Sequence, residues 1–210
     1  AAVRWGMSGA MMLAVARPAR LFSWQAARGP RTSGGGGEGG ATMQDDPRHY
    51  MRVALNVAAV GLARDELPIG AVVVLDGRIL ATAHTAEVSE RRRLVHAELL
   101  ALEAADRIRP FPGRRADVQL FTTVEPCLLC FGAAQFFGLG ALTFALESPG
   151  DGAAHLVSGW QRDPAAMPSL RLPQVTGGLL RAEAQALFRR YIALHSSGAL
   201  WEWAKYLAEL

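Results

Sequence analysis

The sequence predicts an α/β protein: a three-layer α/β/α sandwich in which helices cover both faces of a central mixed sheet of about five strands. Three observations predict this fold class. The pattern begins with a helix and a β-hairpin, and helices and strands then alternate along the chain, which is typical of layered α/β folds. The chain has 210 residues, of which 50% are hydrophobic. That is enough for one domain with a full core and is short for two.

Residues 1–42 are expected to form a flexible leader outside the fold. They carry five arginines and one glutamate, a net +4 against +3 for the whole chain, so the remainder carries −1. Their glycine-rich stretch, 34–40, is typical of a flexible linker. The leader weakly resembles an organelle transit peptide, and the alternatives are an over-extended translation start, with Met43 the true one, or an artefact. The near-neutral remainder does not indicate a general nucleic-acid binder, whose footprint is strongly basic.

The first elements after the leader are a helix and a hairpin. Apolar side chains recur at helical spacing over 48–64 and predict an amphipathic helix. The β-branched run 70–75 predicts the first strand. Asp76-Gly77 then predicts a tight turn, and the chain returns as a second strand over 78–83.

Helices and strands alternate over the rest of the chain. In order, the predicted elements are a helix over 96–107, a strand over 118–124, a helix over 127–137, a strand over 141–146, a fifth strand over 170–175, a helix over 178–195 and an amphipathic helix over 199–210. We therefore expect one domain over 43–195 and a helical segment, 196–210, packed on it. Trp201, Trp203 and Tyr206 of that segment are expected to cover an apolar surface, and the alternative is that they help to close a functional site.

Two short motifs concentrate the chemistry, His96-Ala97-Glu98 and Pro126-Cys127-Leu128-Leu129-Cys130, which holds the only two cysteines. One imidazole and two thiolates are a good ligand set for zinc, and three protein ligands leave a fourth position for water, as in catalytic sites. Each motif opens a predicted helix, whose positive end favours the thiolate. Cys127 and Cys130, three residues apart, share one face of the first turn. Glu98 then lies where it can move that water's protons.

Other interpretations of these motifs remain open. A Cys-x-x-Cys pair is also typical of redox sites, although such sites usually have no His-x-Glu partner upstream. A structural zinc site needs a fourth ligand. The sequence offers no third cysteine for that position, only the other histidines, His49, His84, His155 and His195.

The cysteine spacing and the hydropathy also bear on location. Two cysteines at a metal-binding spacing do not indicate a disulfide framework, so a reducing compartment is expected, and we predict the cytoplasm. No apolar run approaches the roughly 18 residues needed to cross a membrane, so no membrane partner is expected.

The spacing of the two motifs resembles that of the zinc-dependent nucleobase deaminases. Within that cytidine/deoxycytidylate deaminase superfamily, the sequence is most similar to the bacterial tRNA adenosine deaminases and nucleoside deaminases. The similar segments are 67–74, 123–127, 130–133 and 172–191, which together span roughly 43–193.

The resemblance implies a cytidine-deaminase-like fold and one zinc ion per chain. By resemblance, His96, Cys127 and Cys130 hold the ion and Glu98 is the proton shuttle. The resemblance further implies that the main chains of Ala97 and Glu125 flank the base, and that Thr85 lines its pocket.

The positions that would recognise RNA depart from this family. Thr85 stands where members usually carry Asn, and residues 92–95 replace an Asp-Pro-Thr-Ala. Gly138, Ala141 and Glu147 occupy positions that match basic RNA contacts. Losing those charges removes phosphate contacts, which supply much of the affinity for nucleic acid. We therefore favour a small-molecule nucleobase or nucleoside as the substrate over RNA.

Two further clusters have alternative interpretations. Arg91, Arg92 and Arg93 are either a solvated loop or a clamp on a substrate phosphate or carboxylate, with Arg93 as the candidate contact. Phe136 and Phe137 are expected in the core or in a dimer interface rather than as a platform for base stacking. A homodimer is expected.

The leading hypothesis is hydrolytic deamination of the exocyclic amine of a nucleobase, whether free or in a nucleoside or nucleotide, with release of ammonia. The alternative within the same class is tRNA adenosine-to-inosine deamination. The alternative from another class is a catalytically silent, zinc-stabilised module that binds a partner through neighbouring helices. Glu98 argues against that module, because a silent descendant has no need of a proton shuttle.

Overall fold

The computed structural model describes residues 46–108, 116–160, 163, 165–166 and 170–210. The predicted leader, 1–42, lies outside these residues. Among the described residues, no helix is both long and apolar enough to cross a membrane.

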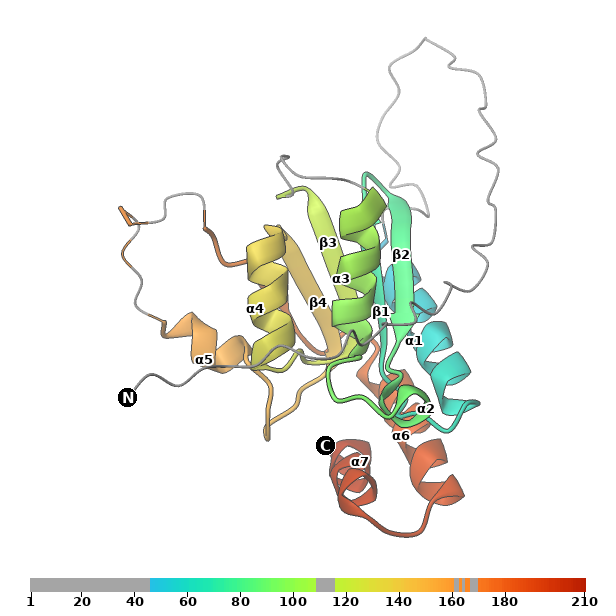
Figure 1. The fold of residues 1–210 in the computed structure, drawn as a ribbon. Coiled ribbons are helices and arrows are strands. Elements are labelled where there is room, and N and C mark those ends of the chain that lie inside the picture. Colours follow the sequence, from blue (N-terminus) through green and yellow to red (C-terminus); the bar gives the residue numbers. More distant parts are fainter. Residues whose placement is uncertain (1–45, 109–115, 161–162, 164, 167–169) are drawn as a thin grey trace, which may run out of the picture. The chain divides into compact units, whose positions relative to one another are not determined.

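A five-stranded mixed sheet forms the centre of the domain (Figure 1). Its strands are β1 (Gly70–Leu75), β2 (Arg78–His84), β3 (Val118–Val124), β4 (Ala141–Leu146) and β5 (Gln174–Thr176), in the spatial order β2-β1-β3-β4-β5. β1 is antiparallel to β2 and β3, whereas β3, β4 and β5 are parallel to one another. The predicted mixed sheet is confirmed. The fifth strand is shorter than expected and begins at Gln174.

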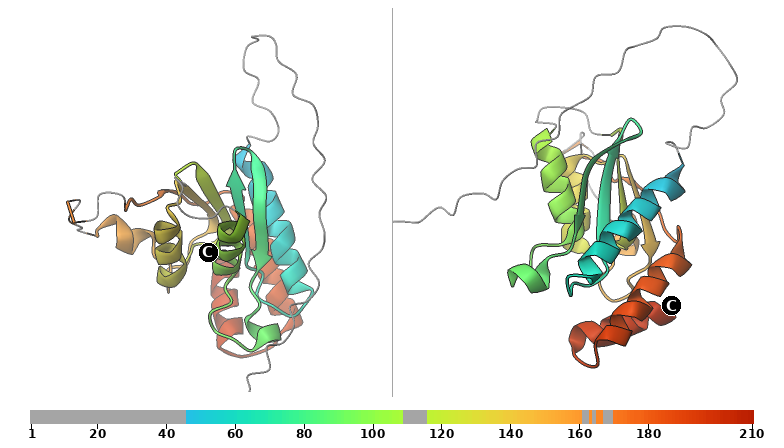
Figure 2. Two further views of the ribbon diagram at one scale, coloured as in Figure 1. Left: turned by 45° about the horizontal axis from the view of Figure 1, so that its top comes forward. Right: turned by 90° about the vertical axis from the view of Figure 1, so that its right-hand side faces the viewer.

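Helices cover both faces of the sheet and complete the predicted sandwich (Figures 1 and 2). The helices are α1 (Pro47–Leu62), α2 (Glu87–Glu90), α3 (Ala97–Ile108), α4 (Leu128–Phe137), α5 (Ala154–Ser158), α6 (Arg181–Leu194) and α7 (Ala199–Glu209). α3 and α4 pack on one face, and α1 and α6 pack on the other. α7 packs against α6. The short helices α2 and α5 were not predicted.

Each face of the sheet has its own apolar core because successive side chains of a strand point to opposite faces. In β1, Val72 and Val74 join the core under α1 and α6, whereas Ala71 and Val73 join the core under α3 and α4. Burial on both faces explains the continuous apolar run of this strand.

α1 lies very close to the sheet at Gly70. A Cβ atom at this position would lie 2.4 Å from the carbonyl oxygen of Ala54 in α1. The Gly70 N–H also donates to the Thr123 hydroxyl at 3.0 Å, which joins β1 to the end of β3. The two strand ends are thereby fixed at the edge of the sheet where α3 and α4 begin (Figure 1).

Candidate active site

Three side chains from two helix starts form a group that suits a metal ion. His96 Nδ1 lies 3.7 Å from Cys127 Sγ and 3.4 Å from Cys130 Sγ. All three ligand atoms lie within 4.8 Å of one another. Tetrahedral zinc, with its usual bond lengths to nitrogen and sulfur, places such atoms about 3.6 Å apart. The donor set and its spacing therefore fit zinc.

The local fold explains why these atoms meet. His96 immediately precedes α3, and Cys127 is the N-cap residue of α4, with an extended backbone. Cys130 follows within the first turn and is completely buried. The two helices lie side by side on one face of the sheet, so their first turns face each other.

Proton sharing among the ligands shifts their pKa values. The Cys130 thiol donates a hydrogen bond that lowers the pKa of Cys127 to about 4. Burial of Cys127 alone would raise this pKa, and a hydrogen bond with His96 lowers it further. The hydrogen bond to Cys127 raises the pKa of His96 to about 9, although burial opposes the shift. The neighbouring Cys127 thiolate and burial raise the pKa of Cys130. These shifts favour a thiolate at Cys127 and protonated His96 and Cys130 when no metal is bound.

A fourth protein ligand is absent from the described part of the chain. The metal-binding group there contains only His96, Cys127 and Cys130. The histidines considered for a structural site are all described, and none belongs to the group: His49, His84, His155 and His195. Three ligands leave a coordination position open, which is the arrangement of catalytic rather than structural zinc sites.

Glu98 lies beside this group, in the first turn of α3. Its side chain is buried, and its Oε1 accepts a hydrogen bond from Thr122 Oγ1 at 3.0 Å. Its Oε2 lies 3.5 Å from Cys130 Sγ. Burial raises the pKa of Glu98, although the Thr122 hydroxyl opposes the shift. A buried carboxyl group with a raised pKa is suited to accept and donate protons.

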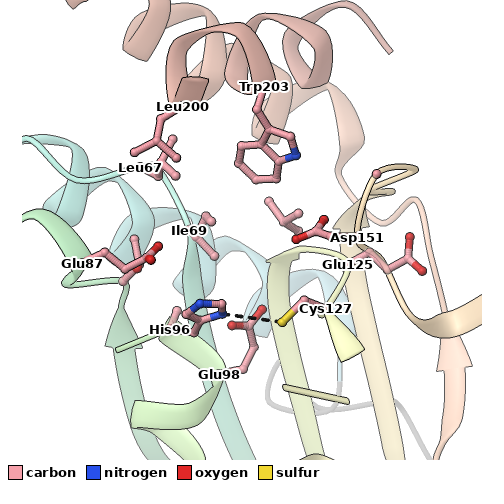
Figure 3. A pocket seen from close by; sticks show the side chains of 14 residues that line it. Leu67, Ile69, Glu87, His96, Glu98, Glu125, Cys127, Asp151, Leu200 and Trp203 are labelled. Atoms are coloured by element: carbon pink, nitrogen blue, oxygen red, sulfur yellow. Dashed lines mark hydrogen bonds between the residues drawn. The ribbon is translucent and has the colours of Figure 1, made fainter. Parts of the chain in front are cut away.

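A cavity of about 430 Å³ opens over Glu98 (Figure 3). This volume is at the lower end of the range for small-molecule sites. The residues that line the cavity are Leu67, Ile69, Thr85, Glu87, His96, Ala97, Glu98, Val124, Glu125, Cys127, Gly150, Asp151, Leu200 and Trp203. The metal-binding group and a cavity of small-molecule size therefore share one site.

Three of the four predicted substrate contacts line this cavity: Thr85, Ala97 and Glu125. Thr85 is buried, and its hydroxyl donates to the Val95 carbonyl at 3.3 Å. Arg93 instead lines a neighbouring cavity of about 580 Å³, together with Arg91 and Arg92. The structure therefore brings the first three residues to the metal group and places Arg93 elsewhere. Their contacts with a substrate stay predictions.

The side chain of Glu125 has a structural role of its own. Its two carboxylate oxygens accept hydrogen bonds from the Ser148 N–H at 3.0 Å and the Ala154 N–H at 2.9 Å. A Cβ atom at Gly152 would lie only 2.4 Å from this carboxylate, so the loop closes tightly around it. In Figure 3 the carboxylate points away from Glu98. The loop after β4 is thereby fixed, and with it Asp151 at the cavity.

A second buried carboxylate positions another wall of the cavity. Glu66 is completely buried and accepts hydrogen bonds from the Ser89 N–H at 2.7 Å and the Val88 N–H at 3.1 Å. Both N–H groups lie in the first turn of α2, where the amides of a helix have no partner within the helix itself. Glu66 therefore fixes this short helix and with it Glu87, whose side chain faces the cavity in Figure 3.

The sequence did not indicate Glu87, Asp151 or Leu200 as site residues, whereas Trp203 lines the cavity as in the alternative interpretation of the C-terminal aromatic residues. Glu87 and Asp151 lie on elements too short or irregular to predict. Leu200 and Trp203 reach the cavity from α7. The aromatic residues of that helix were a visible signal, but nothing local shows which surface they cover.

Phe136 does not belong to the core of this chain. It is 76% exposed, whereas Phe137 packs partly buried against the core under α3 and α4. Of the two locations expected for Phe136, the core is wrong, because the side chain points outward from α4.

Comparison with protein families identifies similar sequences. The model of the "cytidine and deoxycytidylate deaminase zinc-binding region" matches residues 44–146. A tRNA-specific adenosine deaminase of Agrobacterium fabrum is 32% identical over 147 residues, which cover 68% of this chain and 91% of the relative. One of Streptococcus pyogenes serotype M18 is 36% identical over 89 residues, 42% of this chain. The match spans about half the length of the streptococcal relatives.

Solved structures with the same fold include enzymes that act on different substrates. A chain from studies of A-to-I editing by tRNA:A34 deaminases superposes with a TM-score of 0.54 at 29% identity, over 66% of this chain and 98% of that one. A guanine deaminase from Nitrosomonas europaea superposes with a TM-score of 0.56 at 31% identity, over 70% of this chain and 84% of that one. Both likenesses extend over most of the described domain.

Proposed function

Because this chain belongs to the zinc-binding deaminase family that includes the tRNA-specific adenosine deaminases, we propose that it hydrolyses the exocyclic amine of a nucleobase. The observation that carries the proposal is the buried carboxyl group of Glu98 beside a three-ligand metal group, under a cavity of small-molecule size. The products are ammonia and the corresponding oxo base.

His96, Cys127 and Cys130 would hold one zinc ion, since their donor atoms have the spacing and chemistry that zinc prefers. When bound, zinc supplies activation of water by lowering its pKa. The ligands themselves must lose the protons on His96 and Cys130 to bind it. The chain thus contributes a site that is buried on the Cys130 side and open toward the cavity.

Glu98 carries the proton transfers. Water adds its oxygen to the ring carbon that bears the amine, and Glu98 accepts the proton that the water loses. The carboxyl group passes this proton to the ring nitrogen. It then takes the remaining proton from the new hydroxyl group, which becomes the oxo group, and delivers it to the departing amine. The C–O bond forms, the C–N bond breaks, and ammonia leaves. The Thr122 hydroxyl holds the carboxyl group in place through its hydrogen bond to Oε1.

The base would lie between the main chains of Ala97 and Glu125, with Thr85 at the wall of the pocket. All three residues line the cavity, and the side chain of Glu125 is engaged in the loop after β4, which leaves its main chain for the base. Arg93 lies in the adjoining cavity and would reach only a substituent that extends beyond the base.

The second candidate is tRNA adenosine-to-inosine deamination, which the likeness to the Agrobacterium relative favours. Against it, two positions that match the family's basic RNA contacts carry the uncharged Gly138 and Ala141. The third, Glu147, is acidic and forms an ion pair with Arg181. A catalytically silent zinc module is disfavoured by Glu98, which such a module would not need.

Ammonia release from a panel of substrates tests the proposal. The panel holds adenine, guanine and cytosine, their nucleosides and monophosphates, and an unmodified tRNA. We expect turnover of at least one small substrate that disappears in Glu98→Ala. Turnover of tRNA alone, with one anticodon adenosine converted to inosine, would promote the second candidate. A zinc-loaded protein inactive on the whole panel would favour the silent module.

Assembly and location are part of the proposal. A homodimer is supported by an exposed apolar groove of about 470 Å³ between α3 and α4, which Phe136 borders. A reducing compartment, the cytoplasm, is supported by the need for two free thiols, and both cysteines are free in the structure.

A further inference from the structure

α7 supplies the wall of the cavity that lies opposite the metal group. Its side chains Leu200 and Trp203 point toward Glu98 and His96 from across the cavity (Figure 3). The chain enters this helix through Gly198, whose φ of 112° is in a region that favours glycine. The turn brings α7 back against α6 and over the site.

The position of α7 is fixed by packing rather than by a single contact. Ala204 and Leu207 are completely buried in the core under α1 and α6. Two hydrogen bonds join α7 to α6: Arg189 Nη1 donates to the Ala208 carbonyl at 3.1 Å, and Trp201 Nε1 donates to the Ile192 carbonyl at 3.1 Å. These contacts hold the backbone that carries Trp203.

The indole of Trp203 is itself held in place. Its ring meets the ring of Phe188 edge to face, with the centroids 5.8 Å apart and the planes at 78°. Phe188 is completely buried in α6. Trp203 therefore presents a supported aromatic surface to the cavity, and such a surface suits the face of a nucleobase.

The charge of the cavity disfavours a phosphate. Carboxyl groups of Glu87, Glu98 and Asp151 face it in Figure 3, and none of the described residues that line it is a lysine or arginine. Sites for single-stranded nucleic acid combine aromatic stacking with a basic groove along the backbone. This cavity has the aromatic surface without the basic groove.

We propose that Trp203 covers the face of an uncharged nucleobase or nucleoside bound over Glu98. We also propose that α7, which forms the wall of the cavity opposite the metal group, makes a strand of RNA a poor substrate. The inference rests on the proposed deamination and names its substrate class. The arginines 91–93 lie in the adjoining cavity beyond Leu200, so a preference for nucleotides is the competing outcome.

The test compares Trp203→Ala with Tyr206→Ala. Both changes remove an aromatic side chain from α7, but Tyr206 is 52% exposed and is not among the residues that line the cavity. Stacking of a base on an aromatic side chain contributes enough that its loss weakens binding about tenfold. We expect Trp203→Ala to raise KM for the preferred base or nucleoside by about that factor, and Trp203→Phe to restore most of the loss.

A binding measurement separates contact from turnover. In the Glu98→Ala background, where substrate should stay unreacted, calorimetry with the preferred base or nucleoside should show about tenfold weaker binding after Trp203→Ala and no change after Tyr206→Ala. Melting temperatures of all variants report whether α7 remains packed. Weaker binding at an unchanged melting temperature supports contact with the ligand.

Each remaining outcome decides against the inference. Equal KM and equal affinity in the Trp203→Ala and Tyr206→Ala proteins would remove the role of Trp203 while leaving deamination intact. A parent enzyme whose kcat/KM is higher for a monophosphate or for tRNA than for bases and nucleosides would overturn the substrate class. A zinc-loaded parent that releases ammonia from nothing on the panel would overturn the proposed function, and the inference would fall with it.

Discussion

The carboxyl group of Glu98 is the side chain on which the proposed chemistry depends, and Glu98→Gln tests it with almost no change of shape. We expect turnover to fall by about 10² to 10⁴, the usual contribution of a positioned acid or base. Zinc content and melting temperature should stay unchanged, because the amide oxygen can still accept the bond from Thr122. Steady-state kinetics and metal analysis check this.

Glu103→Gln is the matched control for that change. Glu103 lies on the same helix, but its side chain is exposed and pairs with Arg107 at the surface. Its replacement should leave turnover within about twofold of the parent enzyme. If the Glu98→Gln enzyme were equally active, another group would have to move the protons.

The two thiols should be needed for metal retention. Cys127→Ser or Cys130→Ser should remove most of about one zinc per chain, because thiolate is a much better ligand than a hydroxyl. His155→Ala, which removes a histidine outside the group, should keep the full content. Mass spectrometry of the metal content is the measurement, and full occupancy in both serine variants would exclude the assigned site.

Metal affinity should depend on pH because protons compete for the same atoms. The pKa of His96 is raised to about 9 and that of Cys130 is raised as well, so both carry protons at neutral pH in the metal-free protein. Zinc must displace these protons, and its affinity should therefore rise by about tenfold per pH unit for each proton displaced. Chelator competition between pH 6 and 8 measures this, and a flat profile would contradict the proton assignment.

The close approach of α1 to the sheet predicts a large effect from one methyl group. Gly70→Ala should lower the free energy of unfolding by about 1–3 kcal/mol, since the new Cβ would overlap the Ala54 carbonyl. Gly132→Ala is the control within α4, because a Cβ there meets nothing within 4 Å. It should leave stability unchanged or raise it by up to about 1 kcal/mol. Urea unfolding compares the two, and equal stabilities would show that α1 yields at this contact.

The regular elements were largely predictable, and the irregular ones were not. Strands β1, β3 and β4 have the predicted bounds, because buried apolar runs ended by turn residues specify them. The helices α2 and α5 span only a turn or so and show no periodicity from which to predict them. β5 is short and all three of its residues are exposed, so it has no buried pattern to mark its ends.

The same distinction holds for the site. The metal group comes from two local motifs whose spacing is visible in the sequence, and the structure brings those side chains together. Trp203 reaches the cavity only because α6 and α7 fold back against each other, which depends on tertiary packing. The positions of Glu87 and Asp151 depend on the buried carboxylates of Glu66 and Glu125, whose hydrogen bonds no local pattern shows.

The assembled protein is expected to be a dimer through the exposed face of α3 and α4. Phe136→Glu should convert a dimer to a monomer, because it places a charge where an apolar surface would be buried. Val60→Glu is the control, since Val60 is a half-exposed apolar residue of α1 on the opposite face of the sheet. Sedimentation analysis decides, and a parent that is already monomeric would refute the dimer.

Removal of residues 1–42 should change neither the melting temperature nor turnover. Their glycine-rich, arginine-bearing composition offers nothing to a core. Thermal unfolding and ammonia release of the shortened chain measure this. A loss of more than about 2 kcal/mol of stability would show that the segment packs on the domain.

The turn at Gly198 separates the residues that are assigned to the reaction from the helix that covers the cavity. The groups assigned to bond making and breaking come from residues 96–130, whereas the roof of the cavity is a helix joined to α6 by one short turn. Changes at the cavity-facing side chains of α7, Leu200 and Trp203, are therefore expected to alter which molecules enter without disturbing the metal group or the proton transfers. Selection, or a protein engineer, could diversify the substrate range by varying these two cavity-facing positions, while the reaction itself is inherited unchanged.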